Sequence, residues 1–256
     1  LMVSSNIGVS RVIDENYHNQ PEKYVDGLYK LGIATPLNLD IPGAAKKPNI
    51  RRPTKENWSR TALAWMSIGY ETQVPPMNTL AFYNAIANNG VMVKPKFVKA
   101  IMKDGQVVEE IPTEVLNPAI ASPKTIEQIQ TILQKVVSDG LAKPAGSKQF
   151  HVSGKTGTAQ VSKGSGGYKS GQMQYLVSFC GYFPSEAPKY SCIVAIQKPG
   201  LPASGGLMAG SVFSEIAERV YAKHLAQDLK EAKDSTSILT PDVKHGNLAN
   251  ARYILD

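Results

Sequence analysis

Three strand-like segments in the second half of the chain constrain its fold more than any other feature. They lie at about 150–161, 174–183 and 190–198 and are rich in β-branched and aromatic residues. Only the short loop PSEAP separates the second segment from the third. Parallel neighbours need a crossover of about a dozen residues or more, so a short loop favours antiparallel pairing. We predict that the three segments are consecutive antiparallel neighbours.

Helical patterns flank these segments. The clearest helix is predicted over residues 122–140, where Ser122 is the cap, Pro123 takes the first helical position and Gly140 ends the helix. Its apolar stripe consists of Ile126, Ile129, Leu133, Val136 and Val137. An antiparallel sheet covered by helices, an α+β fold, is the architecture that this order of elements favours.

Other elements are expected on either side. Residues 78–90 read as a helix capped by Asn78, and residues 96–111 as a β-hairpin that turns at Asp104-Gly105. A last long helix is expected at about 208–227, with an apolar face formed by Val212, Ile216, Ala217 and Val220. This helix should pack across the sheet.

Composition excludes several classes of protein. The chain has 42% hydrophobic residues and no apolar run long enough for a transmembrane helix. Its net charge is +7, but Lys and Arg are scattered and form no arginine–aromatic stripe, which argues against nucleic acid as a partner. Cys180 and Cys192 lack metal-ligand spacing and lie in apolar strand-like runs. Buried free thiols are favoured there over a disulfide bridge.

A lysine among small hydroxyl residues and glycines marks the first strand, in the sequence VSGKTGTAQ. Gly154 and Gly157 flank Lys155 and let the backbone of a ligand come close. Thr156 and Thr158 share one side, because side chains alternate along a strand. Two hydroxyls and an ammonium predict a wall that recognises a carboxylate. An ordinary edge strand with a solvated lysine is the alternative.

A second candidate element, Ser4-Ser5-Asn6, lies at the start of the chain. A serine and an asparagine two positions apart can converge on one site, where the hydroxyl relays a proton and the amide binds a substrate amide. The alternative is an N-cap before a short helix over residues 7–13. Penicillin-binding proteins and class A β-lactamases carry the motifs S-x-x-K, S-D-N and K-T-G. Here S-S-N precedes K-T-G-T in the matching order.

Longer blocks resemble the second half of the transpeptidase domain of class B penicillin-binding proteins, with the division-specific FtsI group as the nearest. The resemblance runs from Val3 to about Leu225. It rests on the blocks SSNIGVSRV, LGIATPLNLDIPG, SIGYETQVPPMNTLAFYNAIANNGVMVKPKFV, VSGKTGTAQ and VSFCGYFPSEAPKYSCIVAIQKP. It implies part of the penicillin-binding transpeptidase and serine β-lactamase-like fold. The tail TPDVKHGNLANARYIL resembles the opening of a PASTA module.

These matches set the expected domain organisation. Residues 1–227 are expected to be a transpeptidase domain fragment, residues 228–239 a linker, and residues 240–256 the start of a PASTA module. The N-terminus resembles the inside of a domain, so we expect an upstream part in the parent protein. The family's setting implies the extracytoplasmic face of the inner membrane, with an N-terminal anchoring helix in the parent.

The resemblance also implies a reaction. The family acylates a serine with the D-Ala-D-Ala end of a peptidoglycan stem peptide, and an amine from a neighbouring strand then takes the acyl group in septal wall synthesis. β-Lactams mimic the dipeptide and trap the acyl-enzyme, and divisome proteins are expected partners. No metal or cofactor is implied.

The roles carry over residue by residue. Ser4 would relay a proton to the leaving nitrogen, Asn6 would bind the substrate amide, and Lys155 would hold Ser4 and supply positive potential. Thr156, Gly157 and Thr158 would bind substrate, with the two hydroxyls on its terminal carboxylate. The backbone N–H of Thr158 would form half of an oxyanion hole.

Two departures from the family pattern stand out. Val74 occupies a position where the group often has threonine, so a hydroxyl is lost. More importantly, these residues contain no S-x-x-K, the motif that carries the family's nucleophilic serine and its activating lysine. The nucleophile is therefore absent from this chain, and we expect the fragment alone to be inactive. A serine β-lactamase and a non-catalytic β-lactam sensor are the alternatives.

Overall fold

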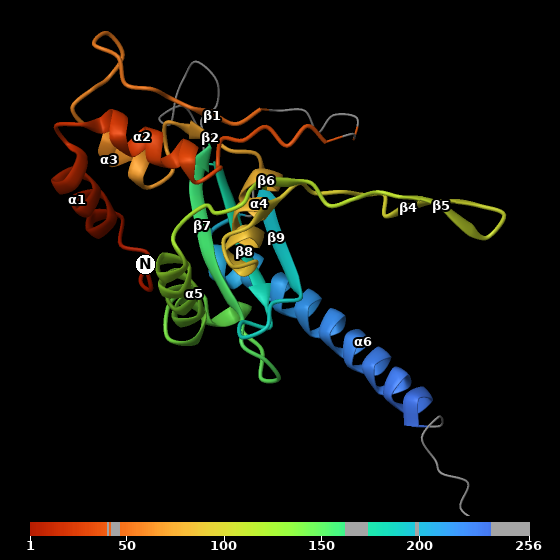
Figure 1. Cartoon of the computed structure of the whole chain (residues 1–256). Helices are drawn as coiled ribbons and strands as arrows, with labels where there is room; N and C mark the ends of the chain where they lie inside the picture. The colour runs from red at the N-terminus through yellow and green to blue at the C-terminus, as the bar shows by residue number, and fades with distance from the viewer. Residues whose placement is uncertain (40, 42–46, 162–173, 198–199, 237–256) are drawn as a thin grey trace, which may run out of the picture. The chain divides into compact units, whose positions relative to one another are not determined.

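The strand-like segments form an antiparallel sheet of β7 (Ser153–Val161), β8 (Gln174–Phe183) and β9 (Tyr190–Gln197) (Figure 1). Their order in the sheet is β7-β8-β9, and both neighbouring pairs are antiparallel. The register places Lys155 opposite Cys180 and Cys180 opposite Ile193. The prediction of three consecutive antiparallel neighbours is therefore confirmed.

The computed structural model describes residues 1–39, 41, 47–161, 174–197 and 200–236, with side chains up to Leu225. The tail that resembles a PASTA opening lies outside the described residues. The chain divides into two units, Leu1–Glu215 and Ile216–Asp256. The sheet and both candidate motifs belong to the first unit.

Helical segments cover both faces of the sheet. On one face, α4 (Pro76–Ala87) and α5 (Pro123–Ser138) enclose Tyr182 in the main core. That core consists of Leu37, Ala81, Ala85, Ile86, Met92, Ile120, Ile126, Leu133 and Tyr182. On the other face Phe179 contacts Phe213, with ring centroids 4.6 Å apart. Because side chains alternate along β8, Phe179 and Tyr182 point to opposite faces. The expected α+β architecture is thus confirmed.

The element order before the sheet follows the local signals. Helix α5 begins after Ser122, whose Oγ accepts a hydrogen bond from the Thr125 N–H at 3.2 Å. Helices α1 (Asn6–Tyr17), α2 (Pro21–Lys30) and α3 (Ala62–Ser67) precede it. A second core of Val25, Ile50 and Met66 holds this N-terminal region together.

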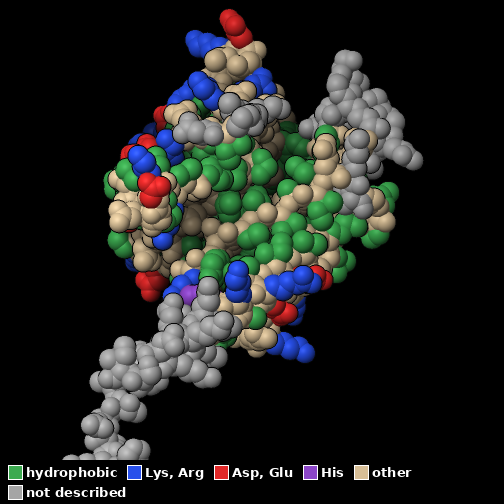
Figure 2. Space-filling model, turned by 90° about the vertical axis from the view of Figure 1, so that its right-hand side faces the viewer, with side chains coloured by type: hydrophobic (Ala, Val, Ile, Leu, Met, Phe, Trp, Pro, Cys, Tyr) green, Lys and Arg blue, Asp and Glu red, His purple; other side chains and the backbone are tan. Residues whose placement is uncertain are grey.

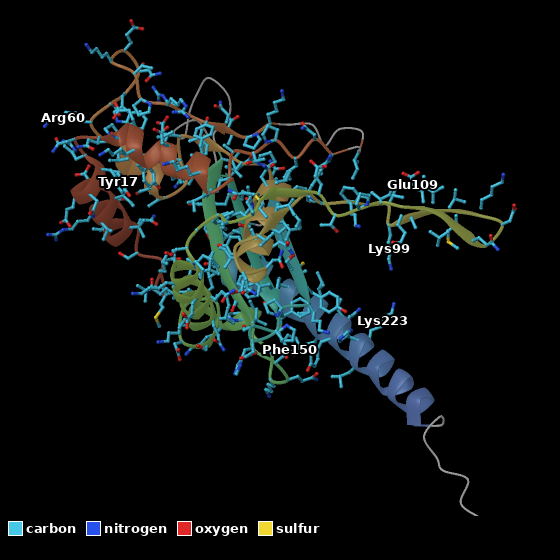
Figure 3. The ribbon with its side chains drawn as sticks, in the orientation of Figure 1. Tyr17, Arg60, Lys99, Glu109, Phe150 and Lys223 are labelled. Carbon is cyan, nitrogen blue, oxygen red and sulfur yellow. The ribbon has the colours of Figure 1, made fainter. Side chains whose placement is uncertain are left out.

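Short strands connect these helices. The pair β1 (Asn49–Ile50) and β2 (Thr72–Gln73) is antiparallel, as is the pair β3 (Met92–Val93) and β6 (Val115–Asn117). The predicted hairpin consists of β4 (Ala100–Lys103) and β5 (Gln106–Glu110), and it extends away from the sheet (Figure 1). Lys99 and Glu109 are labelled on this arm in Figure 3. A 3-10 turn, η1 (Lys143–Ala145), links α5 to β7.

Two helix boundaries differ from the predictions. Helix α4 starts at Pro76 rather than after Asn78, because proline fits the first turn, where its missing N–H has no helical partner anyway. Asn78 is instead buried, and its Nδ2 donates to the Thr35 carbonyl at 2.7 Å. The last helix, α6 (Ser211–Thr236), continues past residue 227 through residues that favour helix, with no Gly or Pro.

The start of this last helix also faces the sheet differently from the prediction. Val212 is 44% exposed, whereas Phe213 is fully buried against Phe179 and Phe183. A six-residue π-helix, η3 (Gly205–Gly210), precedes α6. Its hydrogen bonds run from i to i+5, so the side chains of α6 that point toward the sheet differ from those of a regular α-helix beginning at residue 208. The aromatic ring of Phe213 replaces Val212 as the inward residue.

The two cysteines remain free thiols, as predicted. Cys180 is buried, but Cys192 is only partly buried, so the prediction of two buried thiols is half right. Cys192 lies opposite Gly181, one position along from Cys180. Adjacent positions along β8 face opposite sides of the sheet, so the two thiols point apart and cannot bridge.

Apolar side chains are also found on the surface. Figure 2 shows a hollowed face on which hydrophobic side chains gather, with Lys, Arg, Asp and Glu at its margins. Large hydrophobic residues more than half exposed include Ile7, Leu201, Val3, Val108 and Leu207. None of the described helices has the length and hydrophobicity needed to cross a bilayer.

Candidate active site

The residues of both motifs line one cavity of about 680 Å³. Ser4 and Asn6 come from the start of the chain, and Lys155 to Thr158 come from β7. Ser4 and Lys155 lie 151 positions apart in the sequence and are in contact in the structure. Every site residue that the sequence predicted is therefore brought to the same place: Ser4, Asn6, Lys155, Thr156, Gly157 and Thr158.

The Lys155 ammonium is the centre of the polar contacts. Its Nζ donates to Ser4 Oγ, to the Thr156 carbonyl at 3.0 Å and to Thr156 Oγ1 at 3.2 Å. Burial lowers the pKa of Lys155. Since Ser4 Oγ accepts from the ammonium, its own O–H remains free to donate to a group in the cavity. A lysine and a hydroxyl in this relation can pass a proton between them.

Ser4 and Ser5 divide the two roles that the sequence left open. Ser5 caps α1, because its Oγ accepts from the Gly8 N–H at 3.1 Å. Ser4 has φ of +47°, a left-handed conformation that is uncommon for a residue with a side chain. Strained backbone of this kind clusters at functional sites. The N-cap interpretation is therefore confirmed for Ser5, whereas Ser4 lines the cavity and its catalytic role stays a prediction.

A contact with the end of α5 holds the N-terminal segment in place. The Leu141 N–H donates to the Met2 carbonyl at 3.1 Å. Gly140 allows this approach, since a Cβ at that position would lie 2.6 Å from the Met2 carbonyl oxygen. Gly140 thus ends the helix as predicted and also positions the segment that carries Ser4.

The outer edge of β7 presents backbone groups to the cavity. The Thr156 carbonyl accepts from Lys155, and the Gln160 N–H donates to the Tyr70 hydroxyl at 3.4 Å. Both groups therefore point away from β8. Backbone direction alternates along a strand, so the N–H of Thr158, which lies midway, points to the same edge. That is the orientation that a donor to a developing oxyanion needs.

The two threonine side chains face η3. The Gly205 N–H donates to Thr158 Oγ1 at 3.3 Å, and Thr156 Cγ2 lies 3.7 Å from the position of a Cβ on Gly206. The predicted common side of Thr156 and Thr158 is thus confirmed. Lys155 belongs to the opposite face, and its ammonium reaches the threonine side only by curling over the strand edge.

Sequence reasoning missed the remaining lining of the cavity, part of which packs directly against β7. The cavity is also lined by Ile68, Leu141 and residues 203–207. The pair Gly205-Gly206 was an available signal: a Cβ on Gly205 would lie 2.5 Å from the Gly157 carbonyl oxygen. Ser153, the serine beside Lys155 in sequence, is buried and donates to Ser185 Oγ at 2.9 Å. The Ser153 hydroxyl therefore takes part in a hydrogen bond inside the fold.

Comparison with known proteins assigns the family. The model of the penicillin binding protein transpeptidase domain matches residues 1–218. Penicillin-binding protein PbpB of Mycolicibacterium smegmatis is 28% identical over 86% of this chain and 34% of its own length. The probable peptidoglycan D,D-transpeptidase PbpC of Pseudomonas aeruginosa is 31% identical over 84% of this chain and 35% of its own length.

Solved structures agree with the sequence comparison. Penicillin binding protein 3 of Mycobacterium tuberculosis, complexed with ampicillin, has a TM-score of 0.72 and 27% identity, covering 87% of this chain and 49% of that chain. The transpeptidase domain of Burkholderia pseudomallei penicillin-binding protein 3 has a TM-score of 0.68 and 28% identity, covering 86% of this chain and 61% of that chain.

The chain belongs to the penicillin-binding protein transpeptidase domain family. Its relatives include proteins named FtsI homolog and peptidoglycan D,D-transpeptidase, which places it with the class B, FtsI-type members. The chain spans about a third of the length of the curated relatives cited above.

Proposed function

We propose that the protein containing this chain is a serine-type peptidoglycan D,D-transpeptidase that cross-links stem peptides during septal wall synthesis. The observation that carries the proposal is the contact between Lys155 and Ser4 inside a cavity that also holds Asn6 and Thr158. Relatives with the matching names support it, as does the ampicillin complex of the structurally similar penicillin binding protein 3 of Mycobacterium tuberculosis. The substrate is a stem peptide ending in D-Ala-D-Ala, and β-lactams are competing ligands.

The site residues take these proposed roles. Lys155 holds Ser4 and supplies positive potential, and Ser4 passes a proton to the leaving nitrogen. Asn6 hydrogen-bonds the substrate amide. Thr156 and Thr158 bind the terminal carboxylate, and the Thr158 N–H supplies one donor of the oxyanion hole. Gly157 lines the same cavity, but the close approach that its missing Cβ permits is that of Ser178 Oγ, 2.5 Å from the position of a Cβ, and not that of a ligand as expected.

The acyl-accepting serine and the second oxyanion donor belong to an S-x-x-K segment, which these 256 residues do not contain. We propose that residues 1–227 are the matching part of the transpeptidase domain, residues 228–239 a linker and residues 240–256 the start of a PASTA module. The protein acts on the extracytoplasmic side of the membrane, held there by an N-terminal helix, and works with divisome proteins.

Replacing Lys155 in the full-length protein tests the proposal. Lys155→Ala should slow acylation by both stem-peptide substrate and penicillin, because an electrostatic catalytic group is worth about 2–4 kcal/mol, or roughly 30- to 1,000-fold in rate. Stopped-flow measurement with a fluorescent penicillin gives the rate. Lys124→Ala, at an exposed lysine on α5, is the matched control and should acylate normally. Unchanged acylation in a folded Lys155→Ala protein would refute the proposal.

A further inference from the structure

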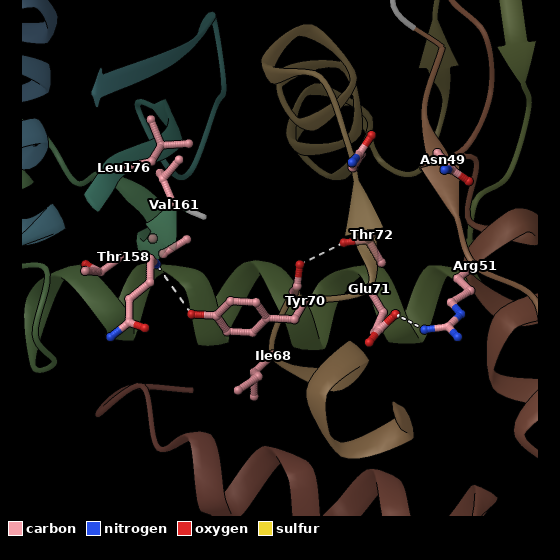
Figure 4. Close-up of a pocket in the computed structure, with 14 residues that line it drawn as sticks. Asn49, Arg51, Ile68, Tyr70, Glu71, Thr72, Thr158, Val161 and Leu176 are labelled. Atoms are coloured by element: carbon pink, nitrogen blue, oxygen red, sulfur yellow. Dashed lines mark hydrogen bonds and ion pairs between the residues drawn. The ribbon is translucent and has the colours of Figure 1, made fainter. Parts of the chain in front are cut away.

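The hairpin arm formed by β4 and β5, residues 94–114, lies apart from the candidate active site and extends away from the sheet (Figure 1). No residue of the arm lines the active-site cavity, nor the groove beside β7 in which Arg51 and Glu71 lie (Figure 4). All residues of β5 are exposed, and so are the last three of β4. A two-stranded hairpin on its own is marginally stable in water, so a further strand would stabilise the arm.

The hairpin arm presents apolar side chains to solvent. Those that are more than half exposed are Phe97, Val98, Met102, Val107 and Val108. Exposed apolar surface that is contiguous in this way marks sites of protein contact. A cavity of about 370 Å³ lies at the root of the arm, and its walls include Phe97, Val98 and Ile111. This cavity offers a place for an apolar side chain of a partner.

The two edges of the arm differ in regularity. Ile101 lies opposite Glu109 and Met102 lies opposite Val107, so Val108 is an extra residue on β5. This bulge bends β5 and interrupts its outer edge, which makes that edge a poor template for a further strand. The bulge adds no residue to β4. The outer edge of β4 is therefore the one suited to strand addition.

Backbone groups of β4 are directed toward that edge. The Ile111 N–H donates to the Lys99 carbonyl at 3.0 Å, so the backbone of Lys99 faces the return limb of the arm. Because backbone direction alternates along an antiparallel strand, the N–H and C=O groups of Ala100 and Met102 point away from β5. Such groups can form a ladder of hydrogen bonds with an added strand.

The charge of β4 indicates what the added strand carries. The limb that includes β4, residues 94–103, contains four lysines and no acidic residue. Lys94 is paired with Glu114, but none of the ion pairs among the described residues includes Lys99 or Lys103. These two lysines share one face of the strand, because side chains alternate with period two. Opposite charges on neighbouring strands attract, so carboxylates on that face of an added strand are favoured.

We propose that the outer edge of β4 is a docking site for an extended segment of a partner protein in which carboxylate and apolar side chains alternate. The segment adds to the arm as a third strand and pairs with the backbone of Ala100 and Met102. Its carboxylates lie beside Lys99 and Lys103, and its apolar side chains cover the opposite face, which carries Met102. The proposal does not rest on the transpeptidase function, because the arm lines no part of that site.

A second copy of this chain fits the same edge less well. The return limb of the arm, residues 104–114, has four acidic residues and no basic one, so its charge would suit β4. The bulge at Val108, however, interrupts the edge that would have to pair. Pairing of β4 with β5 of another copy is also a head-to-tail contact, which grows open fibres instead of closed dimers. A different protein is therefore the favoured occupant.

Binding of synthetic peptides to the full-length protein tests the proposal. The probe is a fluorescein-labelled peptide of about eight residues, an ordinary strand length, in which glutamate alternates with valine or threonine. A second peptide has lysine in place of glutamate. A third is the acidic peptide with every backbone N–H methylated, which removes the donors needed for strand pairing. Fluorescence anisotropy should give the acidic peptide a Kd at least about tenfold lower than that of either other peptide.

Variants locate the binding edge. Met102→Pro removes an N–H that points away from β5, a position where proline is tolerated in a strand, and should weaken binding of the acidic peptide about tenfold. Val107→Pro is the matched control, because Val107 lies opposite Met102 on the other edge, and it should bind as wild type does. Lys99→Glu combined with Lys103→Glu should reverse the preference, so that the lysine peptide binds more tightly. A misfolded arm cannot produce that reversal. Acylation by penicillin should equal that of wild type in every variant.

Several outcomes would overturn the proposal. Wild type that binds no acidic peptide, or binds acidic and basic peptides equally, would do so. Undiminished binding of the methylated peptide would indicate attraction of a polyanion without strand pairing. A loss in Val107→Pro as large as that in Met102→Pro would mean that β4 is not the edge occupied. Self-association of the full-length protein in sedimentation, abolished by Met102→Pro, would show that a second copy occupies the edge instead of another protein.

Discussion

Lys155 shows how a single residue is held in a state that costs stability. Desolvation of the ammonium by burial opposes its charge, and hydrogen bonds to Ser4 and Thr156 only partly offset that cost. Lysines with lowered pKa values are typical of sites that transfer protons. Because burial lowers the pKa of Lys155, its environment can be tested through the pH dependence of stability, without an assay of activity.

The stability of this chain should depend on pH through Lys155. Its folded pKa lies below the unfolded value of 10.5, so between the two values the unfolded state binds more protons and the stability of wild type rises with pH. Lys155→Met removes this group while keeping a long flexible side chain. The free energy of unfolding of wild type minus that of Lys155→Met should therefore increase as pH is raised from neutral toward 10.5.

Urea denaturation of both proteins across this pH range gives the difference. Because the other titrating groups are common to both proteins, their contributions cancel. A difference that stays flat or decreases with pH would show that the ammonium is not desolvated in the folded state.

At the scale of elements, the junction between α5 and the N-terminal segment determines where Ser4 lies. Local signals predict α5 well: Ser122 caps it, Pro123 opens it, and its buried residues Ile126, Leu133, Val136 and Val137 all come from the predicted stripe. The docking of the N-terminal segment against its end has no local signal beyond Gly140, which by itself predicts only the end of a helix.

Substitution of Gly140 tests that junction. Gly140→Ala should lower the free energy of unfolding by about 1–3 kcal/mol, because its Cβ would lie 2.6 Å from the Met2 and Val136 carbonyl oxygens. Gly27→Ala is the matched control: it lies in α2 with open space around its Cβ and should gain roughly 0.5–1 kcal/mol from helix propensity. Urea denaturation measures both. Equal effects of the two substitutions would mean that the segment does not dock tightly against α5.

For the whole molecule, the sequence content limits the chemistry. Ser4, Asn6, Lys155 and the Thr158 N–H form part of a site, and no serine in the 256 residues has a lysine three positions on. Nucleophilic catalysis needs the serine within hydrogen-bonding reach of its activating base. One oxyanion donor without the other costs on the order of a hundredfold in rate.

The chain as given should therefore form no covalent adduct with penicillin. Incubation with a fluorescent penicillin, followed by denaturation and intact-mass measurement, gives the stoichiometry, with the full-length protein as positive control. A stoichiometric adduct that disappears when one of this chain's own serines is replaced would mean that the nucleophile lies within these residues.

The sequence by itself determined the features that depend on near neighbours. Strand-like composition and a short loop identified the β7-β8-β9 sheet, caps and apolar stripes identified α5, and motif order identified the candidate residues. Two predictions of helix geometry were wrong. Pro76, rather than Asn78, sets the start of α4. The π-helix η3 precedes α6, and Phe213 rather than Val212 points into the core.

Only the tertiary structure decided what those residues can do together. It brought Ser4 to Lys155 across 151 positions, assigned capping to Ser5 and the cavity to Ser4, and turned the Thr158 N–H toward the free edge of β7. It also placed Arg51 and Glu71 across a groove from β7, which no motif indicated. The physical reason is that caps and periodicity act within a few residues, whereas these contacts depend on how the core and the close approach of glycines pack distant segments together.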